Sequence, residues 1–229
     1  TRFIPGNYPR SSSNMLLVND GNGNFTNAIA KLSPALENMG MVCDAVAEDI
    51  NKDGKKDLVV LGEWMPIKVF ISSNNTFIDE SEKWFSGSTK GWWNCLLADD
   101  LDNDGDMDFI AGNYGSNNQY GVSSSHPATL VYKDFNQDGQ PDPFFSYYIG
   151  DQSFPFASRD EALGQVNFLR QRYPDYTSYS NSTLQTIFTK QELENTSHLQ
   201  ADLLKTVWLE NTGGKFEIRE LPIQAQFAP

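Results

Sequence analysis

Three copies of one acidic loop constrain the fold of this chain more than any other feature. The copies, called loops 1, 2 and 3, are Asp49-Ile-Asn-Lys-Asp-Gly-Lys-Lys-Asp57, Asp100-Leu-Asp-Asn-Asp-Gly-Asp-Met-Asp108 and Asp134-Phe-Asn-Gln-Asp-Gly-Gln-Pro-Asp142. All three fit the pattern D-x-[DN]-x-D-G-x-x-D without a gap. Side-chain oxygens at positions 1, 3, 5 and 9 are spaced to converge on one hard cation, and position 7 adds a backbone carbonyl. The glycine at position 6 permits the sharp turn that closes such a ring.

The chemistry of these donors favours calcium. Only oxygen atoms are offered, and in numbers that suit Ca²⁺ better than Mg²⁺ or a transition metal. For a single loop the alternative is an acidic turn in solvent, but three complete copies favour metal binding. We therefore predict up to three Ca²⁺ ions. The predicted ligands are Asp49, Asn51, Asp53, the Lys55 carbonyl and Asp57 in loop 1; Asp100, Asp102, Asp104, the Asp106 carbonyl and Asp108 in loop 2; and Asp134, Asn136, Asp138, the Gln140 carbonyl and Asp142 in loop 3.

The flanks of the loops exclude an EF-hand and indicate β-hairpins. An EF-hand needs a bidentate Glu at position 12 and a helix on each side, whereas position 12 holds Val60, Ala111 and Phe145 here. Short runs of β-branched and aromatic residues precede and follow each loop, as in strands. Each loop is therefore predicted to be the tip of a β-hairpin.

A second repeated element completes a four-stranded unit. Leu16–Phe25 and Val207–Phe216 each contain an apolar run, an Asn/Gly turn and a closing aromatic, and Val69–Phe77 is a weaker copy. This arrangement is typical of a hairpin. Loops 1 and 2 begin 51 residues apart, at Asp49 and Asp100, a spacing within the range of propeller blades.

These residues resemble the FG-GAP/VCBS repeat family, the calcium-loop β-propellers that include the head of the integrin α subunit. The resemblance is closest at Val46–Gly62 and Leu97–Gly112 and extends over about residues 14–135 and 205–221. It implies bound Ca²⁺ and a mainly β fold, a partial β-propeller of four-stranded antiparallel blades with calcium-loop hairpins. It does not imply a particular partner, because such blades occur in many unrelated proteins. The arrangement is also similar to large surface proteins of Bacteroidetes that carry these repeats beside an ASPIC/UnbV domain, which is absent from this sequence.

The segment around loop 3 departs from the repeat. Loop 3 starts only 34 residues after loop 2, and no Asn/Gly hairpin separates them. Ser158–Glu161 is a capping box that opens a helical pattern ending before Pro174, Asp175 caps a second helix, and a short third helix is expected at 190–194. We therefore predict blades over residues 1–114, a small α-helical insertion with loop 3 over 115–205, and a return to the blade over 206–229. The alternative is that loop 3 simply begins a fourth blade.

Composition limits the partners and the location. The net charge of −13 argues against nucleic acid and anionic membrane surfaces, and no run of 18 apolar residues offers a membrane insertion. The sequence starts within the repeat pattern and stops where another blade would begin, so we expect it to be part of a longer parent chain. Because weak calcium loops suit the millimolar calcium found outside cells, we expect an extracellular, cell-surface or periplasmic location.

Residues for catalysis or covalent cross-links are scarce. His126 and His198 lie in Ser-rich polar stretches and are expected to be solvated loop residues, and the common catalytic motifs are absent. Alternation directs Cys43 and Cys95 to opposite faces, which favours two buried thiols over a disulfide. Trp92 and Trp93 are expected to pack in the core, with a sugar-stacking surface as the alternative.

Two functions remain open on this sequence, beside a third, purely structural role as a repeat. The first is a non-catalytic, calcium-binding module that contacts a protein or a glycan. The second is an accessory segment of an extracellular carbohydrate-active enzyme whose catalytic residues lie elsewhere in the parent chain.

Overall fold

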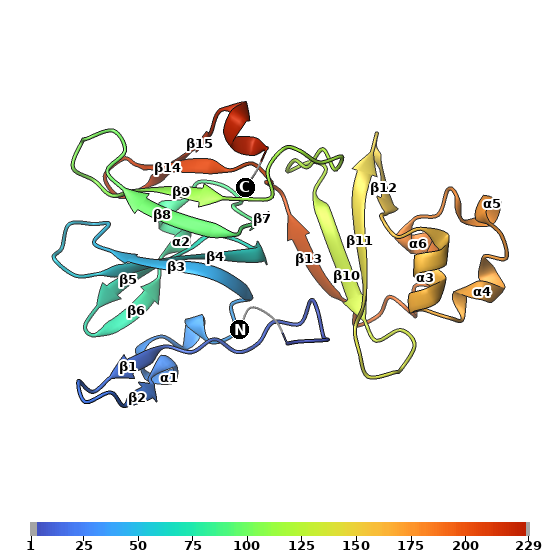
Figure 1. The fold of residues 1–229 in the computed structure, drawn as a ribbon, viewed down its shortest axis with the longest axis horizontal. Helices are drawn as coiled ribbons and strands as arrows, with labels where there is room; N and C mark the ends of the chain where they lie inside the picture. The colour runs from blue at the N-terminus through green and yellow to red at the C-terminus, as the bar shows by residue number, and fades with distance from the viewer. Residues whose placement is uncertain (1–3, 228–229) are drawn as a thin grey trace. The chain divides into compact units, whose positions relative to one another are not determined.

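The computed structural model describes residues 4–227, and the chain forms two compact units (Figure 1). The first unit contains Ser11–Asn117 and continues from Leu203, whereas the second contains Asn118–Asp202 and the stretch that ends at Arg10. The fold is mainly β, with four-stranded antiparallel sheets and few helices, which confirms the predicted partial propeller-like class. Among the described helices, none is long and apolar enough to cross a membrane.

Sheet 1 of the first unit is a consecutive antiparallel meander that carries loop 1 at one end. Its strands are β3 (Met41–Glu48), β4 (Asp57–Met65), β5 (Lys68–Ser73) and β6 (Thr76–Asp79), and the short β7 (Gly91–Trp92) pairs with the end of β4. Asn74 and Asn75 form the β5–β6 turn in left-handed conformations, with φ of 50° and 60°. Asn tolerates that region better than other non-glycine residues, so the Asn/Gly turn signal is confirmed here.

Sheet 2 follows the same plan with strands that are far apart in sequence. The order is β15-β14-β9-β8, from β8 (Cys95–Asp99), β9 (Asp108–Gly112), β14 (Val207–Asn211) and β15 (Phe216–Glu220). Loop 2 joins β8 to β9, and β14 pairs antiparallel with β9 although its first residue, Val207, lies 95 positions after Gly112, the last residue of β9. In both sheets the calcium-type loop thus joins the first two strands and an Asn/Gly turn joins the last two.

The core of the first unit lies between sheets 1 and 2. Apolar side chains of both sheets pack together with α2 (Ser81–Trp84) and with Trp93, whose side chain is fully buried. The Trp93 indole N–H donates to the Thr89 carbonyl at 2.9 Å, so its polar atom is satisfied. The expected core role is confirmed for Trp93. Trp92 is only half-buried and packs against the rings of Trp64 and Tyr114, with centroids 4.7 and 5.0 Å away.

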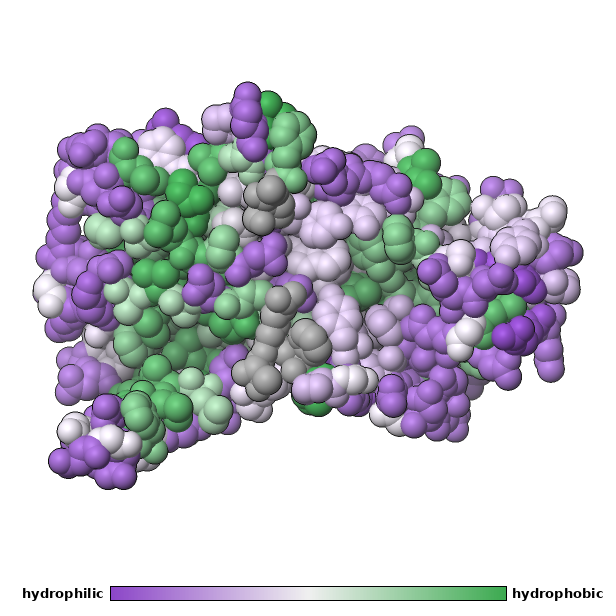
Figure 2. Space-filling model, viewed as in Figure 1, coloured by the Kyte–Doolittle hydropathy of each residue, from purple (hydrophilic) through white to green (hydrophobic). Residues whose placement is uncertain are grey.

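An N-terminal hairpin adds a partial unit beside sheet 1. It consists of β1 (Leu17–Asn19) and β2 (Phe25–Asn27), followed by α1 (Ile29–Leu32) and the 3-10 turn η1 (Pro34–Leu36). Ile29 and Leu36 pack on Val60 and Phe70 of sheet 1, whereas all six strand residues of the hairpin are exposed. Figure 2 shows hydrophilic tips at the loops of sheets 1 and 2 and apolar residues over the strands behind them. Leu97 of β8 is one of the exposed large apolar residues of this unit.

The second unit consists of a sheet covered by short helices. Its strand order is β12-β11-β10-β13, from β10 (Ala128–Lys133), β11 (Asp142–Ile149), β12 (Gln152–Pro155) and β13 (Ser197–Ala201). Loop 3 joins β10 to β11, but the last strand pairs with β10 instead of continuing beyond β12. This strand order differs from that of sheets 1 and 2. Val131 and Phe144 pack against the helices in a separate apolar core.

The helices of this unit start where the sequence predicts but are shorter than predicted. Ser158 and Glu161 form the capping box of α3 (Arg159–Gln165), and the Asp175 side chain caps α5 (Tyr176–Tyr179). The first helical pattern is interrupted at Val166, so that α4 (Leu169–Arg172) is separate, and the second is interrupted before α6 (Leu184–Ile187). Residues 190–194, expected to be a third helix, form turns instead. Four-residue helices do not persist by propensity alone, so tertiary packing holds these segments.

Two minor expectations are wrong. Cys43 is half-buried and Cys95 is exposed, and neither forms a disulfide, so Cys95 is not the buried thiol that was predicted. His198 lies in β13 rather than in a loop, with Nε2 at 2.8 Å from the Thr196 hydroxyl. Tertiary packing decides which face of a short edge strand is exposed to solvent. The alternation of residues along the strand does not show which face that is.

An ion pair ties α4 to the turn at residues 190–194. The Arg172 guanidinium donates to both carboxylate oxygens of Glu192 at 2.8 and 2.7 Å, and the Thr189 backbone N–H donates to the same carboxylate at 2.8 Å. Bidentate pairs of this kind are the stronger class of ion pair. The hydrogen bonds from the Arg172 guanidinium, and to a smaller extent those from Thr189, lower the pKa of Glu192 to about 2.

This pair predicts an acid-dependent contribution to stability. Because the folded-state pKa of Glu192 lies below its ordinary value of 4.5, the contribution is present above pH 4.5 and is lost as the pH falls toward 2. Glu192→Gln should lower the free energy of unfolding at pH 7 by about 1 kcal/mol, since solvent screens a partly exposed pair. The difference from the unsubstituted chain should disappear near pH 2 in urea unfolding followed by circular dichroism. Glu194→Gln, at an exposed neighbour, should show no such pH dependence; an equal response would contradict the assignment.

Candidate metal centre

Loops 1, 2 and 3 share one internal framework of hydrogen bonds. The carboxylate at position 1 accepts the backbone N–H groups of positions 5 and 6, so both of its oxygens fix the turn. In loop 1 these are the bonds from Asp53 and Gly54 to Asp49, at 3.0 and 2.8 Å. The corresponding distances are 3.1 and 3.0 Å at Asp100 and 3.0 and 2.9 Å at Asp134.

Positions 3 and 5 continue this framework. The position-3 oxygens of Asn51, Asp102 and Asn136 accept the N–H of position 5 at 3.0, 3.1 and 2.8 Å. The position-5 carboxylates then accept the N–H of position 7, at 2.9, 2.8 and 2.9 Å. The backbone of each loop therefore orients these side chains, and each oxygen has a second lone pair available.

The backbone conformations explain why the sequence needs glycine at one position. Gly54, Gly105 and Gly139 have φ of 83°, 88° and 91°, in the left-handed region that glycine adopts without strain. Position 4 is also left-handed, with φ of 59° at Lys52, 63° at Asn103 and 63° at Gln137. Of these three residue types only Asn is favoured in the left-handed conformation. The sequence therefore indicates the conformation of position 4 in loop 2 but not in loops 1 and 3.

The carboxylate at position 9 is the buried member of each set. Asp57, Asp108 and Asp142 are 0%, 1% and 4% exposed. Each accepts the N–H of position 2, from Ile50 at 3.3 Å, Leu101 at 3.2 Å and Phe135 at 2.8 Å. Burial raises the pKa of Asp57 and of Asp142, although these backbone bonds act in the opposite direction. Burying a charged carboxylate costs free energy unless a cation or several hydrogen-bond donors compensate its charge. A bound cation at each loop would supply that compensation.

The donor set of loop 2 fits one hard divalent cation. Asp100, Asp102 and Asp104 each offer a carboxylate oxygen, and these three atoms lie within 4.8 Å of one another. Like charges so close repel unless a cation lies between them. Loops 1 and 3 have the same hydrogen-bond framework with an amide at position 3. In loop 3 the Asn136 amide N–H also donates to Asp138 and to the Gln165 carbonyl of α3, both at 3.0 Å.

Three residues that support the loops were not identified from the sequence. The backbone N–H of Ser72 in β5 donates to Asp57 at 2.7 Å, and that of Asn211 in β14 donates to Asp108 at 2.8 Å. These two residues occupy the same place in sheets 1 and 2, next to the second strand. The repeated hairpin could have indicated this, but Val69–Phe77 is one residue shorter than Val207–Phe216, which obscures the correspondence. The third, Gln165, donates from its side chain to the Pro143 carbonyl at 3.0 Å, just after loop 3.

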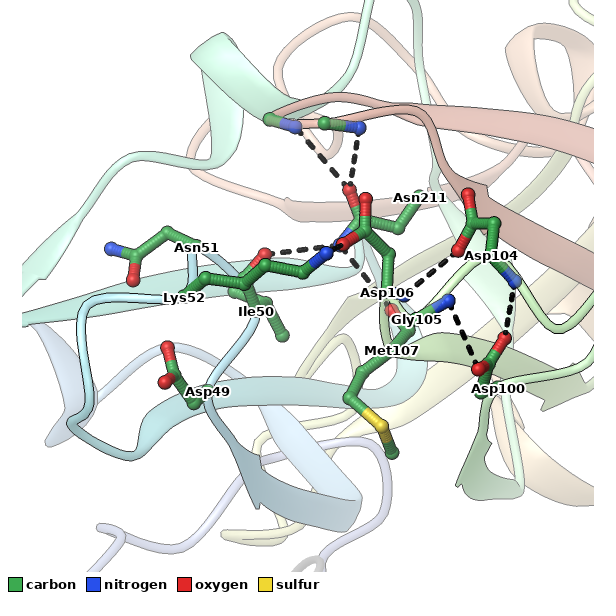
Figure 3. Close-up of polar contacts among 12 residues, drawn as sticks. Asp49, Ile50, Asn51, Lys52, Asp100, Asp104, Gly105, Asp106, Met107 and Asn211 are labelled. Carbon is green, nitrogen blue, oxygen red and sulfur yellow. Dashed lines mark hydrogen bonds and ion pairs between the residues drawn. The ribbon is translucent and has the colours of Figure 1, made fainter.

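Loops 1 and 2 are also joined to each other. Figure 3 shows Lys52 of loop 1 reaching Asp106 of loop 2, with which it forms an ion pair. This contact raises the pKa of Lys52, which therefore stays positively charged at neutral pH. Asp106 is expected to use only its backbone carbonyl for an ion, so the pair leaves the four carboxylate ligands of loop 2 untouched.

Comparison with known protein families finds a match over this same region. Residues 49–111 match the FG-GAP-like repeat family. The match runs from the first residue of loop 1 through sheet 1 and loop 2 into β9, so it includes both loops of the first unit. Together with the sheet topology, it identifies a β-propeller-like repeat in this chain. A comparison with curated proteins found no significant match.

The composition of the loops predicts an order of calcium affinity. Loop 2 has carboxylates at all four side-chain positions, loop 3 has three and no lysine, and loop 1 has three with Lys52, Lys55 and Lys56 nearby. One unit of charge at 4 Å is worth about 1 kcal/mol in a water-like dielectric, or about fivefold in Kd. Affinity should therefore fall in the order loop 2, loop 3, loop 1. Calcium titrations of Asp104→Ala, Asp138→Ala and Asp53→Ala, each lacking one site, should show the strongest, the intermediate and the weakest phase missing, respectively.

Proposed function

We propose that this chain is a calcium-binding, propeller-like repeat module of an extracellular or cell-surface protein, and that it mediates binding to a protein or a glycan. The observation that carries the proposal is the shared framework of the three loops, which orients oxygen donors at positions 1, 3, 5 and 9 in the same way each time. Ca²⁺ would be held by the predicted ligands of each loop. Its role in such a site is structural, since it neutralises clustered carboxylates and fixes the hairpin tips.

The charge of the chain is consistent with this role. Of the 30 acidic residues, 11 are Asp side chains at the predicted ligand positions or at Asp106 in loop 2. Bound cations would reduce the self-repulsion that a net charge of −13 causes. Extracellular fluid holds enough free calcium to fill loops of modest affinity, which supports the proposed location.

We propose no catalytic role for this segment. In the described part of the chain, the acidic side chains that cluster as a group of three, with oxygen atoms within 4.8 Å of one another, are those of loop 2. Because these are the expected ligands of a structural ion, an activity of the whole protein would reside in other parts of the parent chain. Large surface proteins with repeats of this kind remain the expected context.

Isothermal titration calorimetry of the calcium-free chain tests the proposal directly. We expect three Ca²⁺ ions per chain and much weaker binding of Mg²⁺, which demands a smaller octahedral shell. The matched control is the triple variant Asp53→Ala, Asp104→Ala and Asp138→Ala, which should bind none. Heat of binding in that triple variant, or its absence in the unsubstituted chain at millimolar Ca²⁺, would refute calcium binding through these loops.

A further inference from the structure

We propose that Asn211 couples the calcium sites of loops 1 and 2, so that filling one strengthens binding at the other. This inference rests on the proposed calcium binding. It adds cooperativity between two sites, which the pattern of ligands within each loop does not predict. Asn211 is not a ligand; it is a positioning residue that contacts both loops from a strand outside them.

Asn211 directs its backbone N–H and its side-chain NH₂ group to the two loops. It ends β14 and is 1% exposed. Its backbone N–H donates to Asp108 of loop 2 at 2.8 Å, and its side-chain amide donates to the Ile50 carbonyl of loop 1 at 3.0 Å and to the Met107 carbonyl at 3.4 Å. Its side-chain oxygen accepts the N–H groups of Gly213 and Gly214 at 3.1 and 3.3 Å, which orients the amide.

These contacts form a continuous path from one buried ligand to the other. Asp108 accepts from Asn211, Asn211 donates to the Ile50 carbonyl, and the Ile50 N–H donates to Asp57 at 3.3 Å. Ile50 lies between the ligands Asp49 and Asn51, so fixing its peptide groups fixes the start of loop 1 (Figure 3). The Ile50 side chain, 3% exposed, is anchored in the core shared by sheets 1 and 2.

Positive coupling follows from the cost of ordering the loops. Without an ion, the carboxylates of a loop repel one another and the tip is loose. An ion at loop 2 orders Asp108, and through Asn211 it also orders the Ile50 peptide groups of loop 1. The ion at loop 1 then has less disorder to remove, which raises its affinity. Couplings between sites in proteins are typically fivefold or larger. Repulsion between the two ions acts in the opposite direction and is screened by salt, so the measurement belongs at physiological ionic strength.

The second connection between the loops is expected to contribute less. The Lys52 side chain is 60% exposed and that of Asp106 is 15% exposed. Exposed ion pairs contribute little, because water and salt screen them. The buried amide of Asn211 is not screened, and no solvent replaces its bond to the Ile50 carbonyl when it is removed. Asn211 should therefore account for most of the coupling.

Sheet 1 supplies the substitution that isolates this role. Ser72 stands where Asn211 stands in sheet 2, and its backbone N–H makes the equivalent bond to Asp57. Asn211→Ser keeps the backbone N–H that holds Asp108 but removes the amide that reaches Ile50. Lys52→Gln is the matched variant that breaks only the exposed connection.

The experiment measures the calcium Kd of loop 1 with and without an intact loop 2. The amide signals of Gly54, Gly105 and Gly139 in two-dimensional NMR spectra report the three loops separately. In the unsubstituted background, Asp104→Ala should weaken loop 1 by about fivefold or more. In the Asn211→Ser background the same change should have an effect of less than about twofold, whereas in the Lys52→Gln background most of the coupling should remain. No effect of Asp104→Ala on loop 1, or an undiminished effect in Asn211→Ser, would overturn the proposal.

A second measurement avoids dependence on the folding of Asn211→Ser. In the Asp53→Ala chain, where loop 1 lacks a central ligand, calcium at loop 2 should still slow hydrogen exchange of the Ile50 and Gly54 amides. Unchanged exchange at these amides would overturn the coupling. Three loops that bind calcium independently would refute the coupling while leaving the proposed function intact, whereas a chain that binds no calcium would refute the function itself.

Discussion

Removing calcium should lower the melting temperature of the first unit by roughly 10–20 °C. All five tryptophans of the chain lie in this unit, so tryptophan fluorescence reports its unfolding without a contribution from the second unit. An ion that binds only the folded form adds RT ln(1 + [Ca²⁺]/Kd), about 2.7 kcal/mol per site at a hundredfold excess over Kd. Loops 1 and 2 both belong to this unit, so two such contributions are lost. For a chain of this size each kcal/mol corresponds to about 2–4 °C.

The structure indicates why the effect should be large. Each of the two loops holds a carboxylate that is almost completely buried, Asp57 or Asp108, beside further acidic side chains. Three bound ions would add six positive charges and change the net charge from −13 to −7. Both the local repulsion within a loop and the repulsion across the whole chain are thereby reduced. The hairpin tips should loosen first on chelation, since the ligands are concentrated there.

Two controls separate a specific ion from a general effect of charge. Mg²⁺ at the same concentration should restore little of the lost stability, because it requires a near-ideal octahedral shell. Asp104→Ala should reproduce part of the loss even in saturating Ca²⁺. If melting curves in excess EDTA and in millimolar Ca²⁺ superimposed, the calcium sites proposed for loops 1 and 2 would be wrong.

The parts of this fold that could be predicted from the sequence are those specified by short stretches of chain. The ligand pattern of loops 1, 2 and 3 is complete within nine residues each, and the strands beside them follow from neighbouring apolar runs. The capping box at Ser158 and Glu161 is equally local, because both of its hydrogen bonds join residues three apart. In each of these cases local chemistry and the final structure agree, which is the usual condition for a reliable prediction.

The parts that could not be predicted depend on contacts between distant residues. Asn211 and Asp108 are 103 positions apart, and the link from Asn211 to Ile50 spans 161. No local pattern in β14 distinguishes an asparagine that connects two loops from one that only ends a strand. The pairing of β13 with β10 and the interruption of the helical pattern at Val166 are decided in the same way, by packing within the second unit. Propensity and periodicity are weak guides wherever tertiary contacts compete with them.

Gly62→Ala should destabilise the first unit by roughly 3 kcal/mol, at the upper end of what overpacking usually costs. Gly62 lies in β4 opposite an irregular pairing with β3, where the register shifts between Val42 and Asp44. A Cβ at Gly62 would lie 2.1 Å from the Met41 carbonyl oxygen and 2.8 Å from the Val42 Cα. Because both are backbone atoms, no side-chain rotation relieves the clash, and β3 and β4 must separate. The two strands carry loop 1 between them, so calcium binding at loop 1 should weaken as well.

Gly87→Ala is the matched control for this substitution. Gly87 belongs to the same unit, is exposed, and has nothing within 4 Å of an added Cβ. Replacing it should leave stability unchanged or raise it by up to about 1 kcal/mol, because alanine restricts the unfolded chain. Urea unfolding followed by tryptophan fluorescence compares the two variants directly. Within a strand, alanine is ordinarily at least as favourable as glycine. A loss of stability in Gly62→Ala but not in Gly87→Ala would therefore come from the contact of the added Cβ with the Met41 backbone. Equal stability of the two variants would show that β3 and β4 do not approach each other as closely at this position as the structure has them.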